Sequence, residues 1–120
     1  MAHFAEIIDG KVVRVIVVSN NDCPDPAPDN EAQGQAFIAS LGLPGKWVQT
    51  SYSSSFRFNY AGIGWTWDSV AGAFYAPQPF ASWILDDSYT WQAPKPYPNN
   101  EENYIWDETL LEWVEYESEN

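Results

Sequence analysis

Carboxylates and tryptophans are the side chains of this chain that could do chemistry, and both recur in three similar segments. The segments are GWTWDSVAGAFYAPQPF (64–80), SWILDDSYTWQAPKPY (82–97) and NYIWDETLLEWVEY (103–116). Two carboxylates held across a sugar can hydrolyse a glycosidic bond, and clustered carboxylates can bind Ca²⁺. Indole rings can stack on sugars or become buried in a protein interface. The places of these side chains in the fold decide between these possibilities.

The acids of the three segments fall where turns are expected. Asp68, Asp86 and Asp107 occupy the same place in each segment, and an Asp that begins a turn accepts hydrogen bonds from backbone N–H groups just ahead of it. A deep cleft is hard to build from turns, and the chain contains no calcium loop, nucleophile elbow, P-loop or dinucleotide fingerprint. We therefore expect solvated or turn-forming acids, no catalytic residues and no enzyme activity. The other acids considered are Asp87, Glu101, Glu102 and Glu108.

The remaining candidate ligands and nucleophiles are isolated from one another in the sequence. Cys23 is the only cysteine, which excludes an intrachain disulfide, and no basic neighbour makes it a nucleophile. His3 is the only histidine and is expected to be packed or at a rim. Because zinc sites need paired Cys or His motifs, we expect no metal and no cofactor.

Aromatic residues are far more frequent than in ordinary proteins. Seven Trp, seven Tyr and six Phe make up 17% of the chain. Two interpretations remain open: most rings form the core, or a surplus row of rings on a hairpin face forms a contact surface. On the second interpretation two or three tryptophans are exposed, and the contact surface consists of the tryptophans of the repeats. These are Trp65, Trp67, Trp83, Trp91, Trp106 and Trp113.

Each of the three segments has the pattern of a short β-hairpin that turns at its acid. The large residues just before the acid are Trp67, Leu85 and Trp106, and those five or six positions after it are Phe74, Trp91 and Trp113. Such residues can meet as cross-strand pairs. Because a single hairpin is only marginally stable, the copies are expected to share a core.

Proline connectors follow the first two hairpins. They are APQPF (76–80) and APKPY (93–97). Since Pro fixes φ and favours extended backbone, we expect semi-rigid spacers. The alternative is that PKPYP (94–98) docks into an aromatic groove of another protein.

The N-terminal residues HFAEIIDGKVVRVIVV (3–18) are typical of another β-hairpin. Asp9-Gly10 favours a type I′ turn, in which both central residues have positive φ. This register places Ile8 opposite Lys11, Ile7 opposite Val12 and Phe4 opposite Val15. The second strand is apolar on both faces, so we expect it to be central in its sheet.

One helix is predicted after a polar, proline-rich connector (20–30). It runs from about Glu31 to Leu41, with Asn30 and Gln33 as a capping box. Its apolar stripe consists of Phe37, Ile38 and Leu41. Gly42 ends it, and packing must compensate for Gly34, which weakens a helix.

Residues 46–60 predict a second N-terminal hairpin, and with it the domain organisation. The hairpin turns at Ser53–Ser55 and places Phe56, Phe58 and Tyr60 on one face. AGIG (61–64) then predicts a bend. We therefore expect a mainly β fold with one short helix, of the α+β class. Residues 1–63 form a hairpin–helix–hairpin unit, and residues 64–120 form the three hairpin repeats with their proline connectors.

The charge of the chain restricts its partners. Five Lys plus Arg against seventeen acids give a formal charge of −12, which disfavours nucleic acid and anionic membranes and fits a cationic partner. The longest apolar run, Val12 to Val18, is interrupted by Arg14 and is too short to cross a bilayer. The N-terminal sequence MAHFAEIIDG lacks the pattern of a secretory signal.

Several of these motifs together resemble a known group of proteins. MAHFAEI, VVRVIVV, WVQTSY, NYAGIGWTWD and the spacing of PQPF-ASW and PKPYP resemble small proteins encoded by marine tailed bacteriophages, notably those that infect cyanobacteria. The resemblance runs from Met1 to about Tyr116, and NYAGIG with the aromatic-Thr-aromatic-Asp stretch is its most specific part. The hairpin–proline repeats also resemble segments of phage tail-fibre and virion-associated proteins.

The resemblance implies a virus-related protein without catalytic residues. We expect a non-enzymatic virion component, such as a head-decoration or tail-fibre accessory protein, in the virion or in the host cytoplasm during assembly. It would bind a partner protein, either a phage structural protein or a second copy of itself, through an aromatic β-surface. The alternatives are a carbohydrate-binding module for a host-surface glycan and a chaperone for tail-fibre assembly.

Overall fold

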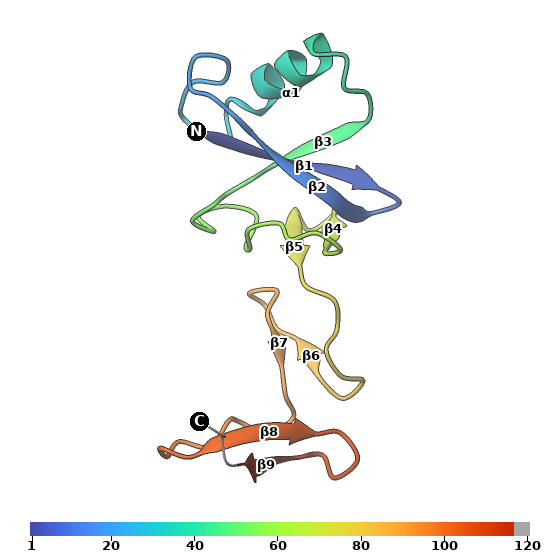
Figure 1. Ribbon diagram of the computed structural model, residues 1–120, viewed down its shortest axis with the longest axis vertical. Coiled ribbons are helices and arrows are strands. Elements are labelled where there is room, and N and C mark those ends of the chain that lie inside the picture. Colours follow the sequence, from blue (N-terminus) through green and yellow to red (C-terminus); the bar gives the residue numbers. More distant parts are fainter. Residues whose placement is uncertain (117–120) are drawn as a thin grey trace. The chain divides into compact units, whose positions relative to one another are not determined.

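The computed structural model describes residues 1–116 and divides the chain into two compact units, Met1–Pro77 and Gln78–Asn120. The regular elements of the described residues are antiparallel strands and a single helix, which confirms the predicted α+β class (Figure 1). The first unit contains β1 (Ala2–Ile8), β2 (Lys11–Val18), α1 (Glu31–Ser40), β3 (Lys46–Thr50), β4 (Thr66–Asp68) and β5 (Ala73–Tyr75). The second contains β6 (Ile84–Leu85), β7 (Trp91–Gln92), β8 (Asn103–Asp107) and β9 (Glu112–Tyr116).

The first repeat hairpin belongs to the N-terminal unit, so the boundary lies after Pro77 and not after residue 63. Strands β1 to β5 form one sheet in the order β3-β1-β2-β4-β5, and β2 is central in it as predicted. The backbone of Val12 accepts a hydrogen bond from Gly64 N at 2.8 Å and donates to Trp65 O at 2.9 Å. These bonds join the start of the first repeat to β2. The first repeat therefore belongs to the first unit, whereas the other two repeats belong to the second.

The β1–β2 hairpin has the predicted turn but only part of the predicted register. Asp9 and Gly10 have φ values of 51° and 76°, as a type I′ turn requires. Beyond the first two pairs the register shifts at a β-bulge, because Val13 has no partner in β1. Phe4 therefore lies opposite Ile16, and the predicted pairing with Val15 is wrong.

Helix α1 approaches the sheet closely through Gly34. A Cβ atom built at Gly34 would lie 2.2 Å from the Phe4 ring, so only glycine lets the helix come this near. Gly34 and Ile38 are the buried residues of the helix, whereas Leu41 is 56% exposed. The buried stripe is thus displaced from the predicted one, since the tight contact with Phe4 sets the rotation of the helix.

The predicted capping box is wrong. Asn30 makes no side-chain hydrogen bond to the helix; its Nδ2 instead donates to the Pro24 carbonyl at 2.8 Å, which fastens the proline-rich connector. The acid of the first helical turn, Glu31, points to the sheet edge. Gly42, with a φ of 79°, follows the helix as predicted.

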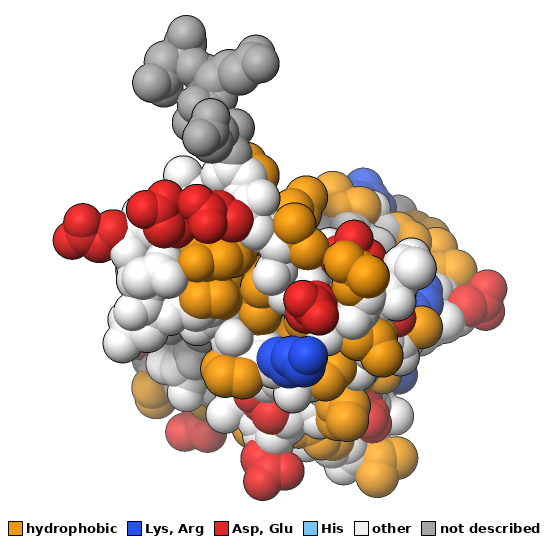
Figure 2. Space-filling view, turned by 90° about the horizontal axis from the view of Figure 1, so that it is seen from below, with side chains coloured by type: hydrophobic (Ala, Val, Ile, Leu, Met, Phe, Trp, Pro, Cys, Tyr) orange, Lys and Arg blue, Asp and Glu red, His pale blue; other side chains and the backbone are white. Residues whose placement is uncertain are grey.

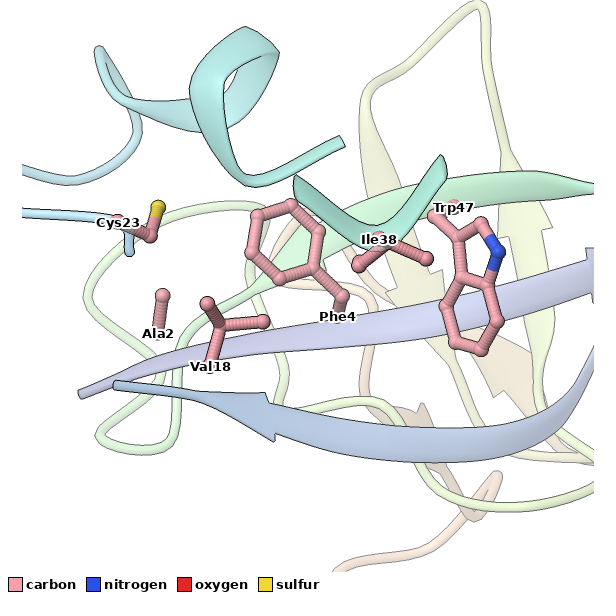
Figure 3. Close-up of a cluster of buried hydrophobic side chains, with 6 residues drawn as sticks. All are labelled: Ala2, Phe4, Val18, Cys23, Ile38 and Trp47. Atoms are coloured by element: carbon pink, nitrogen blue, oxygen red, sulfur yellow. The ribbon is translucent and has the colours of Figure 1, made fainter. Parts of the chain in front are cut away.

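Two apolar clusters lie on the two faces of the sheet. Phe4, Ile38 and Trp47 belong to the cluster beneath α1, together with the buried thiol of Cys23 (Figure 3). The cluster on the opposite face includes Phe74 of the first repeat. Its members are Ala5, Ile7, Val12, Val48, Ala61 and Phe74, with Trp65 and Trp67 packed against it.

The second predicted hairpin does not form: after β3, residues 51–60 make turns and bends. Arg57 and Phe58 have φ values of 57° and 71°, which no strand tolerates. Arg57 turns back to the outer edge of β3, where it donates to Gln49 O at 2.8 Å and to Glu31 Oε1 at 3.0 Å. Side chains thus close an edge that the predicted second strand would have covered.

Candidate functional site

The turns of the three repeats are built as the sequence predicts. In each one Oδ1 of the aligned Asp accepts backbone hydrogen bonds from the residues ahead of it. Asp68 accepts from Val70 and Ala71 at 3.0 and 3.1 Å, Asp86 from Ser88 and Thr90 at 2.8 and 3.0 Å, and Asp107 from Leu110 at 3.0 Å. The N–H of Thr90 is the main reason that the pKa of Asp86 lies below its ordinary value. These acids organise turns.

The predicted cross-strand pairs are also confirmed. Trp67 lies opposite Phe74, Leu85 opposite Trp91 and Trp106 opposite Trp113. The rings of the first pair are 4.5 Å apart between centroids, and those of the last pair are 5.2 Å apart. The alignment of the three segments on their acids therefore identified real structural equivalents.

Three tryptophans of the second unit form an aromatic cluster. Trp83, which precedes β6, meets the rings of Trp106 and Trp113 edge-on at centroid distances of 6.0 and 5.9 Å. Phe80 packs on Trp83 at 5.5 Å, and Tyr97 meets Trp113 at 4.9 Å. Edge-to-face packing adds to the gain from burying the rings. We name Phe80, Trp83, Tyr97, Trp106 and Trp113 the aromatic cluster of the second unit; Trp106 is buried in it, and Tyr97 is 52% exposed.

The connector 93–97 is fastened to the last hairpin. The indole N–H of Trp113 donates to the Lys95 carbonyl at 2.8 Å. The hydroxyl of Tyr97 accepts from the backbone N–H of Tyr104 at 3.0 Å. These contacts within the unit favour the spacer interpretation of the connector.

Glu108 was predicted to be solvated or turn-forming, but it joins two parts of the second unit. Its carboxylate accepts from Trp106 Nε1 at 2.9 Å, from Ser82 Oγ at 2.7 Å and from Ser82 N at 3.0 Å. The indole N–H of Trp106, followed by the Ser82 hydroxyl, holds the pKa of Glu108 below its ordinary value. The sequence carried no signal for this role, because Glu108 and Ser82 lie 26 positions apart.

The six tryptophans predicted to form a contact surface are less exposed than expected. Trp106 is 5% exposed, and the other five are partly buried, so the expectation of two or three exposed tryptophans is wrong. Trp65 and Trp67 lie in the first unit, where they pack against its second cluster. Trp83, Trp91, Trp106 and Trp113 lie in the second unit. The rings shape two cores, in keeping with the first interpretation of the aromatic surplus.

Aliphatic and tyrosine side chains form the exposed face that the tryptophans do not. On β8 and β9 the residues that alternate with Trp106 and Trp113 are Ile105, Val114 and Tyr116, which are 59%, 37% and 48% exposed. Ile105 lies opposite Val114, and Asn103 lies opposite Tyr116. We name Ile105, Val114 and Tyr116 the outer face. The period-2 pattern of NYIWD and EWVEY places these side chains on one face of the hairpin.

Comparison of the chain with protein-family profiles, with curated proteins and with solved structures gives no match.

Two acids lie beside the outer face. Asp107 and Glu112 form the next cross-strand pair along the hairpin after Ile105 and Val114. Residues 78–120 contain ten acids and a single lysine, Lys95, so most of the net charge of −12 belongs to this unit. Figure 2 shows acidic side chains beside hydrophobic ones on the face seen from below.

The described residues offer no cluster for a metal ion. Within residues 1–116 no three His, Cys, Asp or Glu side chains are grouped so that they could hold one. Nor does this part of the chain contain a helix long and apolar enough to cross a membrane. What the described geometry offers is an apolar strip with an acidic border.

Proposed function

We propose that the protein is a non-enzymatic binding protein that docks a basic partner protein on the outer face of the β8–β9 hairpin. The observation that carries this proposal is that the two sides of the β8–β9 hairpin differ in exposure. One side is covered by Trp83 and Tyr97, while Ile105 on the other is 59% exposed. Exposed apolar side chains gathered on one face are a feature of interaction sites.

The acidic border favours a partner of opposite charge. Asp107 and Glu112 lie next to the apolar pairs, and the unit carries ten acids. Such a field accelerates encounter with a basic surface and suppresses self-association. The aromatic cluster behind the face holds the strands in place before binding, which reduces the entropy that docking would cost.

The setting we propose is a tailed-bacteriophage virion, with the protein as a head-decoration or tail-fibre accessory component. The resemblance of the motifs supports this setting, and a basic phage structural protein is the partner it suggests. Its place is the particle or the host cytoplasm during assembly. Mass spectrometry of purified particles distinguishes a virion component from an assembly chaperone, which would be missing from them.

A photo-crosslinking amino acid at position 105 tests the docking surface. The matched control is the same amino acid at Val70, which is 98% exposed but lies in the first unit. In cells that produce the protein and its partners, position 105 should crosslink to one basic protein, and position 70 should not. Val114→Ser should weaken that crosslink. Equal capture at both positions, or capture of a second copy of the chain alone, would contradict the proposal.

A further inference from the structure

The first unit contains a cavity of about 430 Å³. It lies between the start of β1, the connector around Asp25 and the chain that follows β3. Its lining includes a buried amide, several hydroxyl groups and an exposed aromatic ring, and contains no lysine or arginine. These groups belong neither to the outer face nor to the aromatic cluster of the second unit.

Gln49 in the wall of this cavity has an unsatisfied side chain. The residue is completely buried, and its Nε2 and Oε1 atoms have no hydrogen-bond partner. Its backbone groups, in contrast, are paired with Glu31 and Arg57. A buried amide without partners is destabilising, and a ligand in the cavity that supplied the missing hydrogen bonds would explain it. The side chain can both donate and accept, so it suits a ligand group that does the same.

Three hydroxyl groups lie along the same cavity. Ser51 Oγ lies 3.3 Å from Ser53 Oγ and 2.9 Å from Ser55 Oγ, and it accepts from Ser55 N at 2.9 Å. All three residues line the cavity. Each hydroxyl has one donor and two acceptor positions, so the group retains unused hydrogen-bonding capacity.

An aromatic ring stands at the cavity beside these polar groups. Tyr52 is 73% exposed, although it is held in place by two rings. It stacks on His3 at a centroid distance of 5.4 Å and meets Tyr60 at 5.3 Å. An ordered, exposed ring beside convergent polar groups is typical of sites for small ligands with one apolar face.

We propose that this cavity binds one ring of a neutral, hydroxyl-rich ligand, namely a sugar residue of a glycan. A pyranose ring has C–H faces that pack on Tyr52 and hydroxyl groups that both donate and accept, as the Gln49 amide and the serines require. The lining has an acid, Asp25, no lysine or arginine, and a histidine, His3, whose pKa is lowered by burial, which favours a ring without an anionic group. The site lies in the first unit, whereas the proposed protein-docking face lies in the second, so sugar binding would be a separate activity.

Titration of the full chain with methyl glycosides tests this site. The probes are the methyl glycosides of glucose, galactose, mannose, N-acetylglucosamine and rhamnose, and the readout is the amide NMR spectrum, including the Gln49 side-chain signals. Single rings bind weakly, so we expect a dissociation constant of about 1 mM for at least one probe. Tyr52→Ala should weaken binding about tenfold. Tyr97→Ala, which removes a 52% exposed tyrosine from the other unit, should leave it unchanged.

Gln49→Met is a second test, in which stability and sugar binding should change in opposite directions. Met has nearly the same shape without the unsatisfied amide, so this variant should resist urea better than the parent chain and lose sugar binding. No saturable binding by any of the five probes would overturn the proposal. Binding that survives both Tyr52→Ala and Gln49→Met would also overturn it, because the sugar would then occupy another site. Neither result bears on crosslinking at position 105.

Discussion

Removal of the Arg57 guanidinium should open the edge of β3. Arg57 donates to both carboxylate oxygens of Glu31 and to the backbone carbonyl of Gln49. The backbone N–H of Gln49 also donates to the Glu31 carboxylate, at 2.8 Å. Arg57→Met keeps most of the side-chain length and removes every one of the Arg57 donors. It leaves the Glu31 carboxylate with the Gln49 N–H alone and removes the side-chain donor from a strand carbonyl at the edge of the five-stranded sheet.

The loss of stability expected for Arg57→Met lies between the losses measured for exposed and for buried ion pairs. Exposed pairs contribute at most about 1 kcal/mol, whereas breaking a buried pair costs about 3–5 kcal/mol. Both side chains are 23% exposed, and hydrogen bonds to charged groups contribute about 1.5–3 kcal/mol. We therefore expect Arg57→Met to lower the free energy of unfolding of the first unit by about 2–3 kcal/mol. That raises the population of its open form by about 30- to 150-fold.

Cys23 provides a measurement confined to the first unit. It is the only cysteine and is completely buried, and burial raises the pKa of its thiol, so it reacts only when the unit opens. The rate of reaction with a thiol reagent at low urea concentration thus reports the open population. Lys46→Met is the control, because Lys46 is exposed on the same strand. If Arg57→Met reacted no faster than Lys46→Met, the proposed closure of the edge by Arg57 would be wrong.

Three further predictions concern other parts of the molecule. Hydrogen bonds from Arg57 and from the β3 backbone outweigh the effect of burial and hold the pKa of Glu31 below its ordinary value. Unfolding in acid therefore takes up a proton, so the free energy of unfolding of the first unit should fall as the pH drops below about 4.3. In urea titrations at several pH values, the free energy of unfolding of Glu31→Gln should depend less on pH than that of the parent chain. Gly34→Ala should destabilise the first unit by about 1–3 kcal/mol in urea unfolding, despite the better helix propensity of Ala, because the new Cβ would meet the Phe4 ring. Asp107→Ala should lower the stability of the second unit by about 1 kcal/mol, measured by amide exchange in β8 and β9, whereas Asp87→Ala at an exposed position should not.

Local features of the fold could be predicted because a few neighbouring residues determine them. The Asp9-Gly10 turn depends on two residues that tolerate positive φ. The repeat turns depend on one Asp and the backbone just ahead of it, as at Asp86. Cross-strand partners such as Trp106 and Trp113 then follow from the turn. Each of these requires only about ten residues of sequence.

The features that were missed depend on partners far along the chain. The segment 56–60 alternates like a strand, but Arg57 reaches an acid 26 positions away and bends the backbone out of β geometry. Asn30 has the residue type of a helix cap, yet its amide fastens the connector at Pro24. In both cases a tertiary contact outweighed a local pattern.

The proposed docking face was not predicted from the sequence for a related reason. Strand β8 alternates between Ile105 and Trp106, and both are apolar, so period and hydrophobicity do not say which face is covered. Trp83, more than twenty positions earlier, decides the matter by packing on Trp106. Composition drew attention to the larger rings, and the structure uses those rings for the core.

The size of the second unit explains this use of tryptophan. Gln78–Asn120 is close to the length of about 40 residues below which a domain usually needs a disulfide or a metal, and its sequence contains no cysteine. Large rings bury the most apolar area per residue, and the carboxylate of Glu108 adds three hydrogen bonds that join Ser82 to Trp106. A ring that leaves this cluster to contact a partner would weaken the unit that presents it. The proposed docking face is accordingly placed on the smaller residues on the opposite side of the hairpin, and Ile105 is the most exposed of them.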